Sequence, residues 1–355
     1  MTSTEPTAPS GTTASSGTNA SSGTNASSGT TPATESSPAT ASTPSTKPAP
    51  ATASTPSTPS TKSSLIWARR RSTVARFWAS YRTRRAGLLG LAGLTLIALL
   101  ALTAPWTVGA DVQSVTQAPG TALEPPSAEF PLGTDQFGRS LLGLLIWGAR
   151  ISLLVGLLAA VLSVAIGTLV GIIAGHYGGW FSTVVMRITD WFLVMPTLVL
   201  AIVLATVMSR SMWTVVLAIG VTSWPTTARL VRAQTIAVES RPYIERATAL
   251  GGGHGHVMGK HVLPNVMPLV LAQTTLGIST AILTEATLAF LGLGDPTVVS
   301  WGGMLQDARD AGAVSSGHWW YLAPPGIAIA LVALAFTLCG RAVESVLNPK
   351  LGVGR

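Results

Sequence analysis

The chain has 355 residues, of which 47% are hydrophobic and only 10% are charged, whereas an ordinary soluble domain carries about 25% charged residues. The formal net charge of +8 could indicate a soluble nucleic-acid-binding protein, but the basic residues cluster at the ends of apolar runs. The single cysteine, Cys339, excludes an intrachain disulfide and a cysteine-based zinc site. Composition therefore predicts a membrane protein that crosses the bilayer several times and does not bind nucleic acid.

The N-terminal 62 residues differ in composition from the rest of the chain. Residues 1–62 are mainly Ser, Thr, Ala, Pro and Gly and contain no Leu, Ile, Val or aromatic residue. Such a segment buries too little apolar surface to offset the entropy of ordering, so we expect a disordered cytoplasmic tail. Residues 63–85, which are rich in arginine, are expected to form a basic juxtamembrane segment next to lipid headgroups.

Six apolar runs are long enough, or nearly long enough, to cross a membrane, which takes about 20 residues in a helix. The fourth run is the weakest because Trp224-Pro225 interrupts it, and Pro196 is expected to kink the third. The sequence therefore predicts an all-α polytopic fold, with the first helix and an outer segment in 86–150 and a transmembrane domain in 151–350. The predicted spans are 86–106, 151–175, 184–208, 211–229, 266–292 and 324–347.

The loop charges predict the orientation of these spans, because Lys and Arg are enriched on the cytoplasmic side of membrane proteins. If the N-terminus is cytoplasmic, the inner segments carry sixteen of the 22 Lys and Arg residues and the outer segments carry four. The remaining two, Lys47 and Lys62, lie in the tail. We therefore expect both termini to be cytoplasmic, in the cell membrane.

The longest predicted inner loop, 240–265, should contain two short helices. Ser240 can cap the first helix, Pro242 suits its opening turn, and Gly251 can end it in a conformation that favours glycine. The second helix is expected to stop before Pro264. Helices this short are marginal alone, so either neighbouring membrane helices or a docked partner must hold them.

This loop resembles the EAA loop of bacterial ABC-importer permeases, whose short coupling helix fits a groove in a cytoplasmic ATPase. The family has a second alanine where this chain has Arg246, which places a long cation on one face of the helix. It commonly has an apolar residue where this chain has His261, although histidine there is usual in the peptide-transporter branch. The resemblance assigns ATPase coupling to Tyr243, Glu245, Arg246, Ala247, Gly251, His261, Leu263 and Pro264.

Further motifs outside the loop, in the same order as in the family, extend the resemblance to about 85–350. They are similar to segments of the C-type permease of dipeptide and oligopeptide (peptide/nickel) importers, which implies the type I ABC permease fold. The matching segments are 131–140 with 148–152, 285–294 with 300–305, and 319–326.

The resemblance also implies partners and a division of labour. They would be a second, homologous permease subunit, two cytoplasmic ABC ATPase subunits and an extracytoplasmic substrate-binding protein. The chain contains no GxxxxGK[ST] phosphate-binding loop, so it is not expected to be an enzyme or to bind a cofactor. ATP and Mg would be used by the ATPase subunits, and short peptides would cross the cytoplasmic membrane by alternating access.

Four charged residues are candidates for the translocation pathway or a gate, each with a simpler alternative. Glu285 could lie near the substrate path or its outer gate, or make only a helix–helix hydrogen bond or lie at the headgroups. Asp190 could serve translocation, but an interfacial ion pair with Arg187 is the favoured interpretation. Asp135 and Arg139 could form an outer gate or only a turn and helix cap.

The sequence leaves alternatives to a peptide permease open. His254, His256 and His261 suggest a metal site, but no carboxylate or thiolate is fixed nearby, so no metal ligation is expected. The same framework could carry nickel or another non-peptide ligand. An ATP-independent secondary transporter would call for ion-coupling carboxylates and often an inverted repeat, and a membrane anchor would leave the ordered motifs unexplained.

Overall fold

The computed structural model describes residues 75–109 and 111–347. The predicted tail of 1–62 lies outside these residues, as does most of the basic segment 63–85. The contacts divide the chain into Met1–Pro59 and Ser60–Arg355, and the described residues lie in the second unit. Its named elements are α2 (Arg85–Thr107), η1 (Asp111–Gln113), α3 (Leu141–Tyr177), α4 (Gly179–Val194), α5 (Thr197–Val207), α6 (Met212–Glu239), α7 (Pro242–Ala249), α8 (His254–Val257), η2 (Met258–Val262), α9 (Leu263–Phe290), α10 (Trp301–Asp310) and α11 (Trp319–Leu347).

The predicted all-α, polytopic fold is confirmed, with differences in individual spans. Within the described residues, four helices are long and apolar enough to cross a membrane, namely α2, α3, α11 and the helical segment His254–Phe290. The α4–α5 pair makes five if it counts as one span. The fourth predicted span, α6, is a continuous helix around Pro225, but it does not meet these length-and-apolarity criteria. Its second half contains three threonines and two arginines and ends at Glu239, which lowers its apolarity.

Two predicted spans have different limits from those expected. α3 begins at Leu141, well before residue 151, because the apolar run already starts there and the Ser140 side chain accepts a hydrogen bond from the Gly143 N–H at the helix start. The third span is two helices bent by 89°. The kink expected at Pro196 is confirmed, and Met195 before it is extended, as the proline ring favours.

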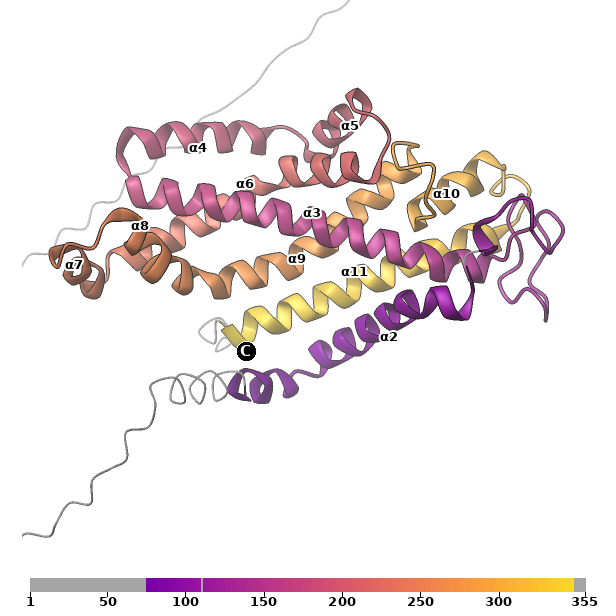
Figure 1. Cartoon of the computed structure of the whole chain (residues 1–355), viewed down its shortest axis with the longest axis horizontal. Helices are drawn as coiled ribbons and strands as arrows, with labels where there is room; N and C mark the ends of the chain where they lie inside the picture. Colours follow the sequence, from indigo (N-terminus) through magenta and orange to yellow (C-terminus); the bar gives the residue numbers. More distant parts are fainter. Residues whose placement is uncertain (1–74, 110, 348–355) are drawn as a thin grey trace, which may run out of the picture. The chain divides into compact units, whose positions relative to one another are not determined.

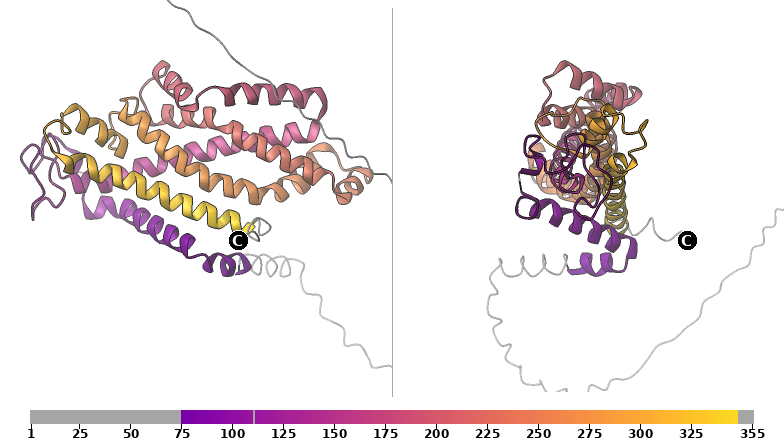
Figure 2. Two further views of the ribbon diagram at one scale, coloured as in Figure 1. Left: turned by 180° about the vertical axis from the view of Figure 1, so that it is seen from behind. Right: turned by 90° about the vertical axis from the view of Figure 1, so that its right-hand side faces the viewer.

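α3 is the central helix of the bundle and packs along both α6 and α9, while α11 packs against α9 and α2 (Figures 1 and 2). Glycines on α3 allow this close approach to α6. A Cβ atom on Gly167 would come within 2.7 Å of the Trp224 carbonyl oxygen, and one on Gly171 within 2.7 Å of the Ala228 carbonyl oxygen. Small residues at helix interfaces let backbones approach in the same way in many membrane proteins.

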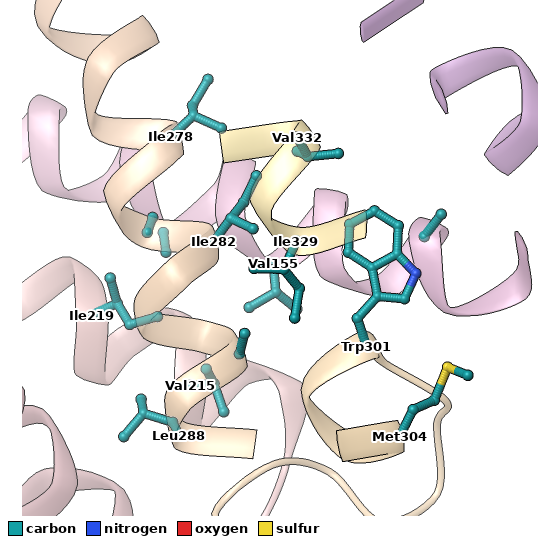
Figure 3. Packing of buried hydrophobic residues seen from close by; sticks show 14 of the residues in the cluster. Val155, Val215, Ile219, Ile278, Ile282, Leu288, Trp301, Met304, Ile329 and Val332 are labelled. Atoms are coloured by element: carbon teal, nitrogen blue, oxygen red, sulfur yellow. The ribbon is translucent and has the colours of Figure 1, made fainter. Parts of the chain in front are cut away.

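Two apolar clusters hold the bundle together. The larger one joins α3, α6, α9, α10 and α11, and Figure 3 shows Ile282 near Val155 and Ile329 in it. The Trp301 indole Nε1–H also donates to the Leu145 carbonyl at 2.8 Å. The smaller cluster lies at the end of the bundle that carries α7 and contains Ile172, Val231, Val238, Ile244, Val257, Val262 and Val266.

The loop 240–265 contains the first short helix as predicted, whereas the second helix does not stop before Pro264. α8, η2 and α9 form one helical segment, His254–Phe290. The π-turn of η2 ends at Val262, two residues before Pro264 in the first turn of α9. The Asn265 side-chain amide donates to the His261 carbonyl at 2.7 Å. The wider π-turn relieves the clash between the Pro264 ring and the carbonyl of the preceding turn.

The ends of α7 agree with the prediction in part. Pro242 is at the first turn, but the cap position is Arg241, and the Ser240 hydroxyl donates instead to the Ala237 carbonyl at 3.2 Å. Gly251 has φ +87°, and its N–H and that of Gly252 donate to the carbonyls of Thr248 and Ala247, both at 2.9 Å. This is the glycine-dependent helix ending that the sequence predicts.

Candidate functional site

The helix α7 is attached to the bundle mainly through one buried side chain. Ile244 is 5% exposed and packs in the smaller apolar cluster, whereas Glu245 and Arg246 are exposed. Leu250 at the helix end is 89% exposed, and Tyr243 is also exposed. An eight-residue helix therefore presents charged and apolar side chains away from the bundle, as a docking element would.

A hydrogen-bonded chain of three side chains joins the base of this loop to two long helices. His176 Nδ1, near the end of α3, lies 2.5 Å from Glu239 Oε1 at the end of α6. His176 Nε2 lies 2.9 Å from Nδ1 of His254, which begins α8. Sequence reasoning missed this chain, because its members are 63 and 78 residues apart and nothing local pairs them.

An open hollow of about 400 Å³ lies beside this chain, lined by His176, Glu239, Ile244, Glu245 and Thr248, among others. Of the residues assigned to ATPase coupling, the structure brings Glu245 to the hollow. It places His261 against Tyr243, with ring centroids 6.3 Å apart, on another part of the loop.

The other residues assigned to ATPase coupling by the resemblance, such as Ala247, Leu263 and Pro264, lie in the loop 240–265. The Ala247 carbonyl takes part in the ending of α7, Leu263 packs against the smaller apolar cluster, and Pro264 is exposed at the start of α9. His256 and His261 form an edge contact with ring centroids 5.7 Å apart. Within the described residues, no group of three or more His, Cys, Asp or Glu side chains could hold a metal ion.

At the opposite end of the bundle, which carries α10, Asp135 and Arg139 form a buried ion pair. Arg139 Nε donates to Asp135 Oδ2 at 2.6 Å, and the two residues are 9% and 0% exposed. Asp135 Oδ1 accepts the backbone N–H groups of Phe137 and Arg139 at 2.9 and 2.8 Å. Asp135 therefore closes a turn, which agrees with the simpler of the two interpretations given above. The cap of α3 is Ser140 rather than Asp135.

The charges of this ion pair act on the pKa of Asp307 on α10. Burial raises the pKa of its carboxyl group, the positive charge of Arg139 opposes the rise, and the negative charges of Asp135 and Asp310 add to it. At the α10 end, Asp307 thus lies within electrostatic reach of two further carboxylates, Asp135 paired with Arg139 and Asp310 paired with Arg309, so protonating Asp307 relieves repulsion there.

Glu285 lies inside the bundle near the end of α9 and is only 3% exposed. The hydroxyl groups of Ser152 on α3 and Ser300 before α10 interact with its carboxylate, whereas its Oε2 atom has no hydrogen-bond partner among the described residues. This burial does not agree with the alternative that Glu285 lies among lipid headgroups. The carboxylate instead connects α9 to α3 and to the segment that leads into α10.

Asp190 on α4 has a different partner from the one predicted. Its Oδ1 atom accepts from Arg229 Nη2 on α6 at 2.5 Å, rather than from Arg187. Both side chains are about half exposed. The helices α4 and α6 contact one another, which brings together residues 39 positions apart, whereas the spacing of Asp190 and Arg187 suggested a pair within one helix.

Comparison with known proteins identifies the family. Residues 167–353 match the model of the binding-protein-dependent transport system inner membrane component family. The chain belongs to this family.

Named relatives of this permease family are similar along most of their length. The chain is 37% identical over 285 residues, 79% of this chain and 93% of the relative, to the di/tripeptide transport system permease protein DppC of Pseudomonas aeruginosa. It is 36% identical to the dipeptide transport system permease protein DppC of Alkalihalophilus pseudofirmus, covering 75% and 86% of the two chains. It is 35% identical to the probable D,D-dipeptide transport system permease protein DdpC of Escherichia coli, covering 71% and 84%.

The resemblance inferred from the sequence motifs is thus confirmed at the level of the permease family. The family match includes α7 and the whole loop 240–265, together with Asp190 and Glu285. Asp135 and Arg139 lie before residue 167, outside the matched range. The exposed helix of this permease-family chain is therefore part of the family's shared region, whereas the buried ion pair lies in the segment before it.

Proposed function

We propose that the chain is the permease subunit of an ATP-driven ABC importer that moves short peptides across the cytoplasmic membrane by alternating access. The relatives quoted above are named for dipeptide or di/tripeptide transport. The observation that carries the proposal is the exposed helix α7, which Ile244 attaches to the bundle. The hydrogen-bonded chain His254–His176–Glu239 connects the loop that carries α7 to α3 and α6.

In this proposal, α7 is the coupling helix and docks on an ATPase subunit. Tyr243, Glu245, Arg246 and the exposed Leu250 would contact the ATPase, and Gly251 would set the direction in which the chain leaves the helix. His261, Leu263 and Pro264 would hold the loop against α9, and Ala247 would complete the ending of α7.

ATP-driven closure of the ATPases would move α7, and Ile244 would transmit the movement to the smaller apolar cluster. The chain through His176 would transmit it to the ends of α3 and α6. Glu285 connects three segments near the other end of α9 and would change partners as the outer side opens. The Asp135–Arg139 pair and the exposed Asp190–Arg229 pair would hold together the other segments that form the gate.

The complete importer in this proposal has a second permease subunit, two ATPase subunits that use ATP and Mg, and an extracytoplasmic substrate-binding protein. This chain itself binds no cofactor and hydrolyses no ATP. Residues 1–62 would be a cytoplasmic tail, 63–85 a juxtamembrane segment, 86–150 the first helix and outer segment, and 151–350 the transmembrane domain, with both termini cytoplasmic. A nickel permease or an ATP-independent transporter has less support, because the relatives quoted are named for peptides.

Affinity purification of the native complex in mild detergent tests the proposal. Wild-type protein should recover a P-loop ATPase and a second permease, whereas a Gly251→Pro variant should lose the ATPase, because proline cannot adopt φ +87° and α7 is misdirected. Gly317→Pro is the matched control, since Gly317 has φ +77° in a loop at the opposite end. Recovery of a correctly folded wild-type chain alone would contradict the proposal.

A further inference from the structure

A cavity of about 390 Å³ lies among the middle parts of α3, α6 and α9 and the junction of α4 with α5. It is separate from the hollow beside α7 and from the buried ion pair at the α10 end. Its volume falls within the range of about 300–1,000 Å³ in which proteins hold small ligands.

The lining of this cavity is polar but uncharged. Hydroxyl groups and one side-chain amide line it together with aliphatic groups, and no Asp, Glu, Lys, Arg or His is among its lining residues. Six polar residues make no side-chain hydrogen bond within the described part of the chain, so their donors and acceptors are available: Ser163, Thr197, Ser223, Thr226, Gln273 and Thr280.

The cavity has a buried floor and an open rim. Ser163 on α3 and Thr222 on α6 are 5% and 3% exposed. The exposed rim consists of Thr197 on α5, Thr226 one turn further along α6, and Thr280 on α9. Polar groups in the middle of apolar helices are costly unless they meet protein or water. A ligand can therefore enter from the rim and reach hydroxyl groups at the floor.

A break between two helices and a proline inside a third helix adjoin the same cavity. The break between α4 and α5 opens on it, with Leu193 on one side and Thr197 on the other. Pro225 in α6 also lines it and leaves the Val221 carbonyl without its usual helical partner. Non-helical backbone at membrane depth persists where it lines a cavity, and broken helices commonly mark the binding sites of transporters.

These groups match the main chain of a peptide. Each hydroxyl can donate and accept one or more hydrogen bonds, and the Gln273 amide can do both, which suits successive N–H and C=O groups. A lining without fixed charge neither traps a charged peptide nor excludes one, so recognition through the main chain tolerates many side chains.

We propose that this cavity is the chain's half of the peptide path, in which Ser223, Thr226, Gln273 and Thr280 hydrogen-bond the main chain of the passing peptide. The inference rests on the proposed function and adds to it the residues that meet the substrate. The second permease subunit would close the open rim.

The test uses the complete importer reconstituted in proteoliposomes and follows uptake of the dipeptide Ala-Ala. A Thr280→Cys variant is made with Cys339→Ala, which removes the only native thiol of this chain. Before labelling, loss of the Thr280 hydroxyl should already lower dipeptide uptake severalfold below that of the Cys339→Ala parent, and this lower rate is the baseline for the labelling. Labelling the assembled complex with a negatively charged methanethiosulfonate should then lower uptake at least tenfold, and reduction with dithiothreitol should restore it. Because the label is added after assembly, a folding defect cannot cause the loss.

Thr83→Cys in the same background is the control, because Thr83 is exposed near the start of α2, far along the chain from the cavity. It should label fully and leave uptake unchanged. A labelled Thr280→Cys importer that retains full uptake would overturn the inference, as would failure of that cysteine to label with or without ATP. A parent importer that assembles but takes up no Ala-Ala or Ala-Ala-Ala would instead contradict the proposed peptide function itself.

Discussion

The two ends of the bundle use similar residue types in opposite ways. At the α10 end, Asp135 and Arg139 are buried, share a 2.6 Å hydrogen bond and hold a turn through backbone N–H groups. At the α7 end, Glu245 and Arg246 are exposed on a short helix that has one buried side chain. A buried, fully paired charge fixes a structure, whereas an exposed pair of charges on a weakly attached helix is available to a partner.

The largest expected effect follows from breaking the buried pair. Arg139→Ala leaves the Asp135 carboxylate buried without its cation and should lower the free energy of unfolding by about 3–5 kcal/mol. Thermal unfolding of the purified protein in detergent measures the change. Arg246→Ala, at the exposed end, should leave the unfolding temperature nearly unchanged. Equal losses for both variants would contradict the difference between the two ends.

The next effect concerns the transmission of movement at the α7 end. His176→Ala removes hydrogen bonds to Glu239 and His254 and should reduce dipeptide uptake several-fold while the ATPase still co-purifies, since the exposed face of α7 is intact. Uptake and ATP hydrolysis by the reconstituted importer measure this. His318→Ala, in a loop at the α10 end, is the matched control. Loss of the ATPase from the His176→Ala complex would mean that the chain holds the docking surface rather than linking it to the helices.

A smaller effect is expected in the pH dependence at the α10 end. Because the folded protein raises the pKa of Asp307, the protonated form is favoured in the folded state. Stability should be fully present below the ordinary pKa of Asp307 and should fall as pH rises through the raised value. Asp307→Asn should remove this part of the pH dependence of the unfolding temperature. An unchanged pH profile in the Asp307→Asn variant would contradict the electrostatic account of this end.

The smallest effect is expected for the exposed pair on α4 and α6. Asp190→Asn should change the free energy of unfolding by at most about 1 kcal/mol, because exposed ion pairs are screened by solvent. Thermal unfolding at low and high salt measures it. A change comparable to that of Arg139→Ala would show that this pair is shielded from water in the assembled protein.

Much of the helical architecture could be predicted from the sequence, because apolar runs of sufficient length have few alternatives in a membrane. The limits of α2, the kink at Pro196 and the glycine ending of α7 follow from local rules. The prediction that the second loop helix stops before Pro264 was wrong. Proline normally ends a helix, but here a π-turn shortly before Pro264 lets the helix continue past it.

For the candidate site, the sequence located the loop, its charged residues Glu245 and Arg246 and the intramembrane acid Glu285, since each has a local signal in charge, spacing or hydrophobicity. The partner of Asp190, the chain through His176 and the uncharged cavity required the tertiary structure. Each of these joins side chains on different helices, and their relative positions depend on how the helices pack. Sequence alone thus determined which segments are helical and which loop is polar, whereas packing decided which side chains meet.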